Sequence, residues 1–385
     1  MSAHLLLRIV QGSAWLIAIS WIYKAVEAAL GLRRIANLLE ERYDCPVAGT
    51  PLLTVVVPAR NEAADIAECL KSLIAQDYSN LQIITVNDRS TDETGALMDA
   101  LAKAFPERLR ALHITELPED LLGKTHAMAM AASQSQAEWL LFTDADVLFR
   151  PDSVRRSLAY AVASGADHLV TMPTTIIRRW DEGALLGFFQ IFGLWAARPW
   201  KVADPRARRD AIGVGAFNMI RRGAYEQIGG FEALRMEIVE DLGLGRRVKR
   251  AGLAQRIAFG RELVRLHWAS GALGLVRVMT KNIFSAFRFY ISLTLIACAW
   301  LIAFCAAPAF GLLFSQTRLP AILALAAIAV TYWLYGKISG IPAWQSLLSP
   351  IAALVFVYAL LRSMVTTLRQ GGVMWRGTFY PLKTL

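Results

Sequence analysis

The sequence predicts an α/β domain with a mostly parallel sheet, held at a membrane by hydrophobic helices at both ends of the chain. Three observations predict this. Strand-like and helix-like segments alternate between residues 52 and 262, and long apolar runs lie before and after that region. Hydrophobic residues make up 55% of the 385 residues and charged residues only 19%, which is too apolar for a wholly soluble protein of this size.

The first apolar run, residues 5–30, predicts one membrane span. Arg33 and Arg34 follow it, and positive residues after a span favour a cytosolic location for the next domain. A cleaved signal peptide is the less favoured alternative, because no small-residue cleavage site precedes Arg33.

Three further apolar runs follow the α/β region, at residues 290–314, 320–335 and 349–368. Each approaches the ~20 residues that a helix needs to cross the hydrocarbon, although the middle run is short. Three crossings from the cytosol would leave a basic tail outside, against the positive-inside rule. Either one segment is re-entrant or the rule is broken here. The basic residues of that tail are Arg369, Arg376 and Lys383.

Residues 263–289 have a different pattern. Arg277, Lys281 and Arg288, at offsets of 4 and 11, would share one face of a helix, which predicts an amphipathic helix at the membrane interface. An amphipathic helix packed on the soluble domain is the alternative. The net charge is +10, with Lys and Arg beside the apolar runs, so we expect a bilayer with anionic lipids as the partner and no nucleic acid.

The chain therefore divides into six segments. They are an N-terminal anchor, a linker, the α/β domain, an interfacial helix, three transmembrane helices and a C-terminal tail, at residues 1–34, 35–51, 52–262, 263–289, 290–368 and 369–385. The four cysteines form no CxxC pair, which argues against a zinc site and a disulfide framework.

Four strands separated by helices are predicted in the first part of the α/β domain. The strands are residues 52–57, 81–86, 109–114 and 139–143, and the helices are residues 62–74, 92–104 and 124–135. Strands about thirty residues apart with helices between them form βαβ units, and hence a parallel sheet covered by helices. Ligands of such sheets bind beyond the carboxyl ends of the strands.

Polar residues follow the first two strands at those ends. The first strand runs into residues 58–62, so Arg60, Asn61 and Glu62 emerge at its carboxyl end and open a predicted helix, where a nucleotide could meet backbone amides. A plain helix start is the favoured alternative for this segment taken alone. Asp88 ends the second strand, placed to accept hydrogen bonds from a base or a ribose. Residues 90–93 after it also read as a helix cap.

Lys124, Asp144 and Asp146 carry the strongest indication of chemistry. Lys124 follows a glycine before a predicted helix and could reach a diphosphate, although the GxxxxGK spacing of a Walker loop is absent. Asp144 and Asp146 follow a buried strand, and two adjacent carboxylates are costly there unless a positive charge lies between them. Mg²⁺ or Mn²⁺ bound to diphosphate oxygens supplies that charge, because hard cations combine carboxylates with substrate phosphates.

Later in the domain, residues 213–217 predict a flexible loop of small residues and residues 228–231 a turn. Glu240 and Asp241 then precede a predicted helix, residues 242–250. A helix N-terminus satisfied by acids is an equally weighted alternative for this pair, because the macrodipole favours it.

Residues 185–192, next to Trp195 and Trp200, are apolar enough to line a lipid entrance, although a core helix is the more favoured interpretation.

Taken in order, these motifs resemble the inverting family-2 glycosyltransferases with the GT-A fold, and the resemblance covers residues 52–255. The motifs are PARNE at residues 58–62, NDRSTD at 87–92, GK at 123–124, DAD at 144–146, GGF at 229–231 and ED at 240–241. Their order and spacing together are highly specific, which implies a Rossmann-like GT-A domain.

The WRGTFY segment at residues 375–380 narrows the resemblance. It is similar to an element of membrane enzymes that glycosylate lipids, although Thr378 stands where that pattern has Arg. The layout of one N-terminal and three C-terminal spans looks most like the hopanoid-biosynthesis-associated glycosyltransferases of bacteria. The QxxRW element of processive synthases is absent around Trp268, which disfavours polymerisation.

The resemblance implies a nucleotide-sugar donor, with a UDP-sugar favoured. Glu62 and Asp88 would hold its nucleoside, and Pro58, Arg60 and Lys124 would complete the donor site.

The resemblance also implies that Asp144 and Asp146 bind the metal and the ribose-phosphate, and that Asp241 is the general base toward a lipid acceptor. A single displacement needs a base for the acceptor hydroxyl and a metal to neutralise the leaving diphosphate. The expected location is the bacterial cytoplasmic membrane, with the catalytic domain facing the cytosol.

Two rival functions stay open. A sugar nucleotidyltransferase also uses a parallel sheet and carboxylate-bound Mg²⁺, but it would need a glycine-rich phosphate loop after the first strand, and residues 58–62 contain no glycine. An inactive membrane scaffold that retains the fold is the second rival.

Overall fold

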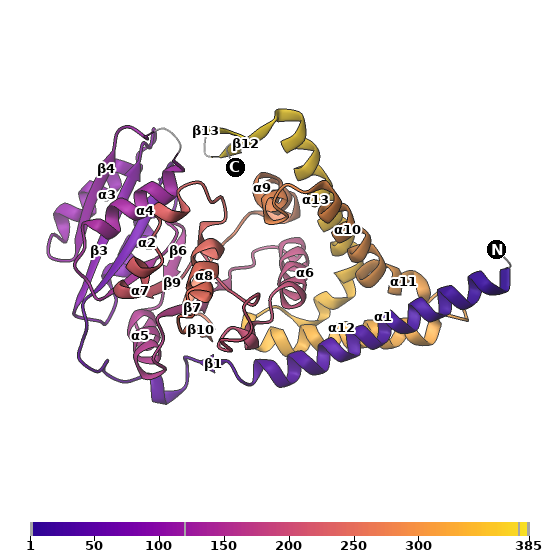
Figure 1. The fold of residues 1–385 in the computed structure, drawn as a ribbon. Helices are drawn as coiled ribbons and strands as arrows, with labels where there is room; N and C mark the ends of the chain where they lie inside the picture. Colours follow the sequence, from indigo (N-terminus) through magenta and orange to yellow (C-terminus); the bar gives the residue numbers. More distant parts are fainter. Residues whose placement is uncertain (1–2, 119–120, 376–377, 383–385) are drawn as a thin grey trace. The chain divides into compact units, whose positions relative to one another are not determined.

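The computed structural model describes residues 3–118, 121–375 and 378–382. The chain folds into two compact units (Figure 1). Ile35–Ile176 and Pro199–His267 form the α/β unit. Among the described residues, the helical unit consists of residues 3–34, Ile177–Arg198 and the part of the chain from Trp268 to residue 382.

The main sheet of the α/β unit has eight strands among the described residues, in the order β1-β10-β7-β9-β5-β2-β3-β4. The strands in that order are Ala36–Asn37, Gln255–Phe259, His168–Met172, Asn218–Arg221, Trp139–Phe142, Leu53–Ala59, Leu81–Asp88 and Leu109–Ile114. All neighbours are parallel except β9, which is antiparallel to β5 and β7. The four strands predicted from sequence are confirmed with nearly the predicted bounds, as β2, β3, β4 and β5.

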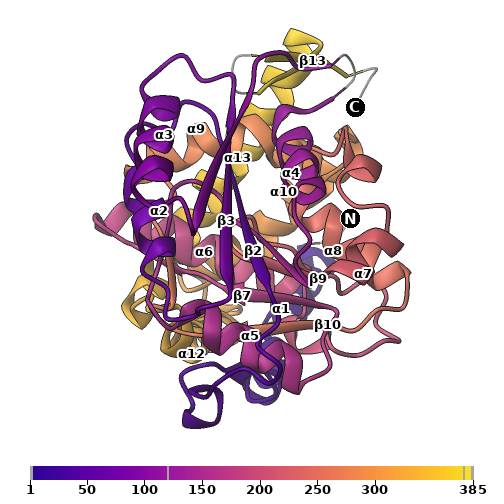
Figure 2. The same cartoon turned by 90° about the vertical axis from the view of Figure 1, so that its left-hand side faces the viewer.

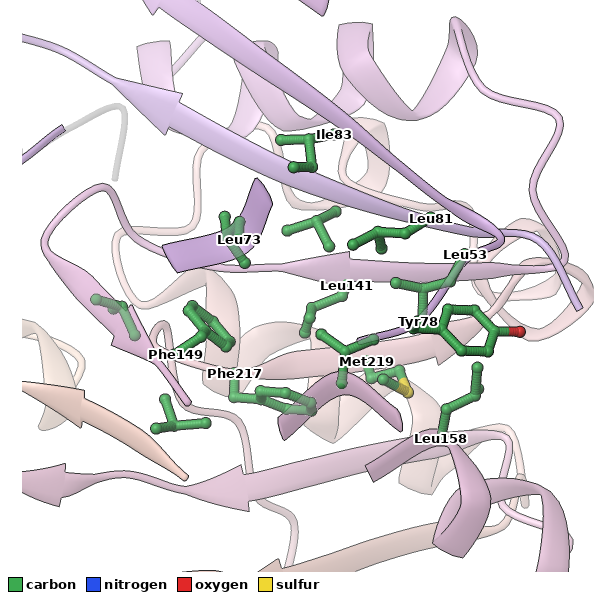
Figure 3. Close-up of a cluster of buried hydrophobic side chains, with 14 of the residues drawn as sticks. Leu53, Leu73, Tyr78, Leu81, Ile83, Leu141, Phe149, Leu158, Phe217 and Met219 are labelled. Carbon is green, nitrogen blue, oxygen red and sulfur yellow. The ribbon is translucent and has the colours of Figure 1, made fainter. Parts of the chain in front are cut away.

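The side chains of the sheet alternate between two apolar layers. Val55 and Val57 of β2 join one buried cluster and Val56 joins the other. The first cluster packs beneath α2 (Ile66–Ile74), α3 (Thr94–Ala104) and α5 (Ser153–Ala163). Figure 3 shows part of this cluster, around Leu53, Leu141 and Phe217. The second packs beneath α4, α7 and α8. In Figure 2, α2 and α3 lie on one side of β2 and β3, and α4 lies on the other.

The helices of this unit lie between the strands. They are α2 Ile66–Ile74, α3 Thr94–Ala104, α4 Gly123–Ser133, α5 Ser153–Ala163, α7 Arg222–Gln227 and α8 Glu240–Arg250, with short 3-10 turns η1 Glu41–Tyr43, η2 Pro199–Lys201 and η3 Glu232–Leu234. A second sheet, β6-β11-β8, consists of Val147–Phe149, Val264–Leu266 and Thr174–Thr175.

The segment expected as a linker, residues 35–51, contributes to the α/β unit. Its strand β1 pairs with β10, and Leu38 is fully buried. The guanidinium of Arg156 on α5 donates to the Leu38 carbonyl at 3.0 Å and pairs with Asp44. These contacts fix the chain to the sheet as it enters the unit.

The helical unit holds four helices long and apolar enough to cross a membrane, among the residues searched. They are His4–Leu32, Ile291–Gly311, Arg318–Ser339 and Ala343–Gln370, which lie close to the four spans predicted from sequence. In secondary-structure terms they are α1 Ala3–Leu32, α10 Ile291–Leu301 with η4 Ile302–Ala306 and α11 Ala307–Gly311, α12 Arg318–Ser339, and η5 Ala343–Leu348 with α13 Ser349–Gln370.

Two further helices belong to this unit. The apolar segment expected either at a lipid entrance or in a core helix is α6, Trp180–Ala196, and Leu185, Leu186 and Phe188 are buried among its neighbours α9, α12 and α13. The carboxylate of Glu182, fully buried, accepts hydrogen bonds from the backbone amides of Arg178 and Gly271, so it joins the starts of α6 and α9.

The expected interfacial helix is shorter than predicted. Val264–Leu266 is strand β11, and α9 runs only over Gly271–Ala286. The expectation that Arg288 shares its charged face is wrong, because Arg288 follows the helix end with a φ of 52°. Arg277 is exposed on α9.

The C-terminal segment forms a hairpin, β12 Gly372–Trp375 with β13 Thr378–Pro381. Arg376 and Gly377 of the WRGTFY segment and Lys383 of the basic tail lie outside the described residues.

Candidate active site

Three parallel strands bring their carboxyl ends to one edge of the main sheet. β2, β3 and β5 are neighbours in register, so the residues that follow them meet at that edge. Glu62 follows β2, Asp88 ends β3 and Asp144 follows β5. The structure therefore brings together acids that are far apart in the sequence.

Lys124 lies at the centre of the polar cluster. It is in the first turn of α4, and its Nζ lies 2.6 Å from Asp144 Oδ1 and 2.6 Å from Glu240 Oε1. One ammonium group thus joins the end of β5 to the start of α8. Burial opposes the charge on Lys124, but the carboxylates of Asp144, Glu240 and Asp241 outweigh it and raise its pKa.

Two carboxyl groups at this edge carry raised pKa values. Burial and then the charges of Asp144 and Glu62 raise the pKa of Asp146 to about 7. Burial and then the charge of Glu240 raise the pKa of Asp241 to about 7, although Lys124 opposes that shift. The cluster holds more negative charge than Lys124 neutralises, which is the electrostatic setting in which a bound cation lowers the energy.

Asp241 lines a pocket with Lys124 and Asp144. The pocket has about 210 Å³ of space, part of it open to solvent. Its other lining residues are Met128, Phe142, Thr143, Gly215, Asn218, Phe231 and Glu240. Asp241 is in the first turn of α8, whose N-cap is Val239, and its Oδ1 accepts a hydrogen bond from the Leu242 amide at 2.7 Å. It therefore does not occupy the N-cap position.

A buried polar chain supports the backbone of Asp241. Gln255 Nε2 donates to His168 Nδ1 at 2.9 Å, which leaves His168 Nε2 as the donor to the side-chain oxygen of Asn218, Oδ1. Asn218 Nδ2 then donates to the Asp241 carbonyl at 3.4 Å. Burial lowers the pKa of His168 to about 4, so the ring is neutral and keeps this tautomer.

Asp88 lies against the start of α4. The residue is 4% exposed, and Arg89 Nε donates to its Oδ1 at 2.7 Å. A Cβ at Gly123 would overlap Asp88 Oδ2, so only glycine allows Asp88 to approach the residue before Lys124. Asp88 and the Gly-Lys pair are therefore neighbours at this edge of the sheet.

The segment after β2 differs from the expectation. The helix does not open at residues 60–62, because α2 begins at Ile66. The amides there donate to side chains of the next βα loop: Asn61 to Ser90 at 3.0 Å, Glu62 to Thr94 at 2.8 Å, and the following residue to Asp92. The idea that a nucleotide meets free backbone amides at Asn61 and Glu62 is therefore wrong.

Two residues expected to bind the nucleotide-sugar donor, Pro58 and Arg60, are not fully exposed. Pro58 is buried inside β2, in register with Val86 of β3. Arg60 is only partly exposed, beyond the strand end.

No group of three His, Cys, Asp or Glu side chains among the described residues is placed to hold a metal by itself. Asp144 and Asp146 supply carboxylate oxygens, the donor type that Mg²⁺ and Mn²⁺ prefer, and the pKa of Asp146 is raised by its burial and then by the charges of Asp144 and Glu62. These residues fit an ion whose remaining ligands come from a diphosphate, and they do not fit an all-protein metal cage.

Sequence reasoning missed Glu240, Asn218 and His168 as site residues. Glu240 belongs to the ED motif but has no role in the sequence-based prediction, yet it is 7% exposed and ion-paired with Lys124. Asn218 is a lone polar residue in an apolar run, a signal of a buried hydrogen-bond partner. His168 begins a strand that the sequence analysis did not predict.

Residues 54–229 match the family model described as glycosyl transferase family 2. A 4,4'-diaponeurosporenoate glycosyltransferase of Staphylococcus aureus is 29% identical over 199 residues. That match covers 50% of this chain and 50% of the relative, so the chain spans half the length of the relative it matches.

A similar fold is found in a mannosyltransferase from Pyrobaculum calidifontis, solved in complex with GDP-Man and Mn²⁺. It has a TM-score of 0.52 at 20% identity and covers 93% of this chain and 99% of its own. The family match agrees with the fold, a mostly parallel sheet with one antiparallel strand. It also agrees with the acidic residues at the ends of the strands. The α/β unit of this chain therefore has the GT-A fold, and residues 54–229 within it match glycosyl transferase family 2.

Proposed function

We propose that this protein transfers a sugar from a nucleotide-sugar donor to a lipid acceptor by a single displacement that inverts the anomeric carbon. The observation that carries the proposal is the cluster at the sheet edge, where Lys124 joins Asp144 to Glu240 and Asp241 lines the same pocket. A displacement needs positive charge beside the leaving diphosphate and a base beside the acceptor, and the cluster holds both kinds of group.

Asp241 is the proposed base. As the acceptor oxygen bonds to the anomeric carbon, Asp241 takes the proton of that oxygen, and the bond to the diphosphate breaks with its electron pair on the diphosphate. A pKa of about 7 suits this role, because a base works best when its pKa lies near the operating pH. No covalent intermediate is required.

Asp144 and Asp146 are the proposed ligands of Mg²⁺ or Mn²⁺, together with diphosphate oxygens. When bound, the cation neutralises charge that develops on the leaving diphosphate. Lys124 lies 2.6 Å from Asp144 and is the second positive group proposed to meet the diphosphate. Glu62 and Asp88, at the ends of the neighbouring strands, are the proposed partners of the nucleoside.

The lipid acceptor is supported by the helical unit and by one relative. Four helices in the described part of the chain are long and apolar enough to cross a membrane. The Staphylococcus aureus relative carries the name of a carotenoid acid, 4,4'-diaponeurosporenoate. We propose an apolar polyisoprenoid-derived acceptor, with a hopanoid as the compound that the sequence resemblance favours, and a UDP-sugar as the favoured donor.

The test is reconstitution of the full chain in liposomes that contain bacterial lipid extract, followed by separate addition of UDP-sugars and GDP-sugars with Mn²⁺. Mass spectrometry of the extracted lipids should show a new glycolipid with one donor. EDTA and Asp146→Asn should each remove it. Undiminished transfer by Asp146→Asn in EDTA would disprove the metal assignment, and the absence of any glycolipid with every donor would count against the function.

A further inference from the structure

Residues 212–216 form a loop that touches Asp144 and Asp241, two of the acids of the proposed mechanism. On one side the loop is attached to the end of β5. The Asp144 amide donates to the Gly215 carbonyl at 3.1 Å, and the Thr143 hydroxyl donates to the Ala216 carbonyl at 2.8 Å. The loop therefore follows any movement of the strand end that carries Asp144.

On its other side the loop lies directly against α8. A Cβ at Gly213 would overlap the backbone carbonyl of Asp241, and a Cβ at Gly245 would overlap the carbonyl of Ile212. Backbone meets backbone at both places, which only glycine permits. These two contacts fix the distance between the loop and the first two turns of α8, which carry Asp241.

Gln255 of β10 fastens the two parts together. It is 1% exposed, accepts from the Ile212 amide at 3.2 Å and donates to the Ile212 carbonyl at 3.0 Å. The side-chain nitrogen of Gln255, Nε2, also lies 3.2 Å from the Gly245 carbonyl oxygen. One buried side chain thus links the loop, α8 and the main sheet.

The two glycines of the loop contact different acids in different ways. A Cβ at Gly215 would lie 2.5 Å from Asp144 Oδ2, at the end of a side chain, whereas a Cβ at Gly213 would meet the backbone of Asp241. We infer that residues 212–216 are a positioning element that sets the spacing between Asp144 on the donor side and Asp241 on the acceptor side. This inference rests on the proposed function.

Two substitutions separate the two contacts. Gly215→Ala should turn the Asp144 carboxylate away with little effect on folding, so Mn²⁺-dependent binding of UDP or GDP, measured by calorimetry on the full chain in detergent, should weaken at least tenfold. Gly213→Ala should displace α8, so kcat should fall at least a hundredfold while UDP or GDP binds within about twofold of wild type. Gly223→Ala is the matched control, because nothing lies within 4 Å of its Cβ position.

The outcomes distinguish this inference from the function on which it rests. If neither wild type nor Gly223→Ala transfers sugar, the proposed function fails. If both transfer sugar and Gly215→Ala binds the nucleotide as wild type does, the positioning role is overturned. It is also overturned if both loop variants lose binding and turnover to the same extent. Should Gly213→Ala not fold, the Gly215→Ala measurement still decides, because its Cβ meets only the end of a side chain.

Discussion

Asp241 is the residue on which the mechanism depends most. Asp241→Asn removes the proton acceptor and keeps the shape, and Asp241 is not the N-cap of α8. We expect the variant to keep its melting temperature and its nucleotide binding but to lose about 10²- to 10⁴-fold in transfer rate. Rates and thermal unfolding measured on the same preparation check this. Transfer within a few-fold of wild type would assign the proton to another group.

The raised pKa of Asp241 predicts a pH dependence. A base acts only when ionised, so kcat should rise with pH up to about 7 and then level off. After burial, the charge of Glu240 is the largest cause of the shift. Glu240→Gln removes that charge and should move the acid limb of the pH profile to lower pH. A profile that does not move would show that another group sets the limb.

At the level of elements, the sequence predicted the strands β2 to β5 well and the later strands poorly. Continuous apolar runs such as that of β2 identify buried parallel strands. β7, β9 and β10 begin with the polar residues His168, Asn218 and Gln255, whose partners are one another. Local pattern cannot show that these polar groups satisfy each other across the sheet, so the strands were missed.

The candidate site was likewise predicted in part. Acids at strand ends were expected, since position along a parallel strand indicates the edge at which a residue emerges. The ion pair between Lys124 and Glu240 could not be predicted, because the two residues are 116 positions apart in the sequence and meet only through tertiary packing. The satisfied amides after β2 were also missed, because their partners lie in the next βα loop.

Helix packing in the helical unit gives a stability prediction with an internal control. A Cβ at Gly336, in α12, would overlap the backbone carbonyl of Ile341, whereas nothing lies within 4 Å of the Cβ position of Gly193 in α6. Gly336→Ala should cost about 1–3 kcal/mol through overpacking. Gly193→Ala should be neutral or stabilising by up to about 1 kcal/mol. Melting temperatures in detergent test this, and equal values for the two variants would contradict the packing described.

For the whole molecule, the expected orientation places the α/β unit in the cytosol. Ala203 is exposed on that unit, and Cys45 is the one cysteine of the chain that is not buried. A Cys45→Ser, Ala203→Cys variant should react with a membrane-impermeant maleimide in inside-out vesicles and be protected in right-side-out vesicles. The opposite pattern would contradict the orientation inferred from Arg33 and Arg34.

The same labelling of an Arg369→Cys variant tests whether three spans or a re-entrant segment separate the α/β unit from the tail.

The central claim is a single displacement at the anomeric carbon, and the stereochemistry of the product tests it most directly. The glycolipid made by the reconstituted full chain from an α-linked nucleotide sugar can be examined by proton NMR at the anomeric position. Direct attack by an acceptor deprotonated by Asp241 predicts a β-linked product. An α-linked product, which a single displacement cannot form, would contradict the account.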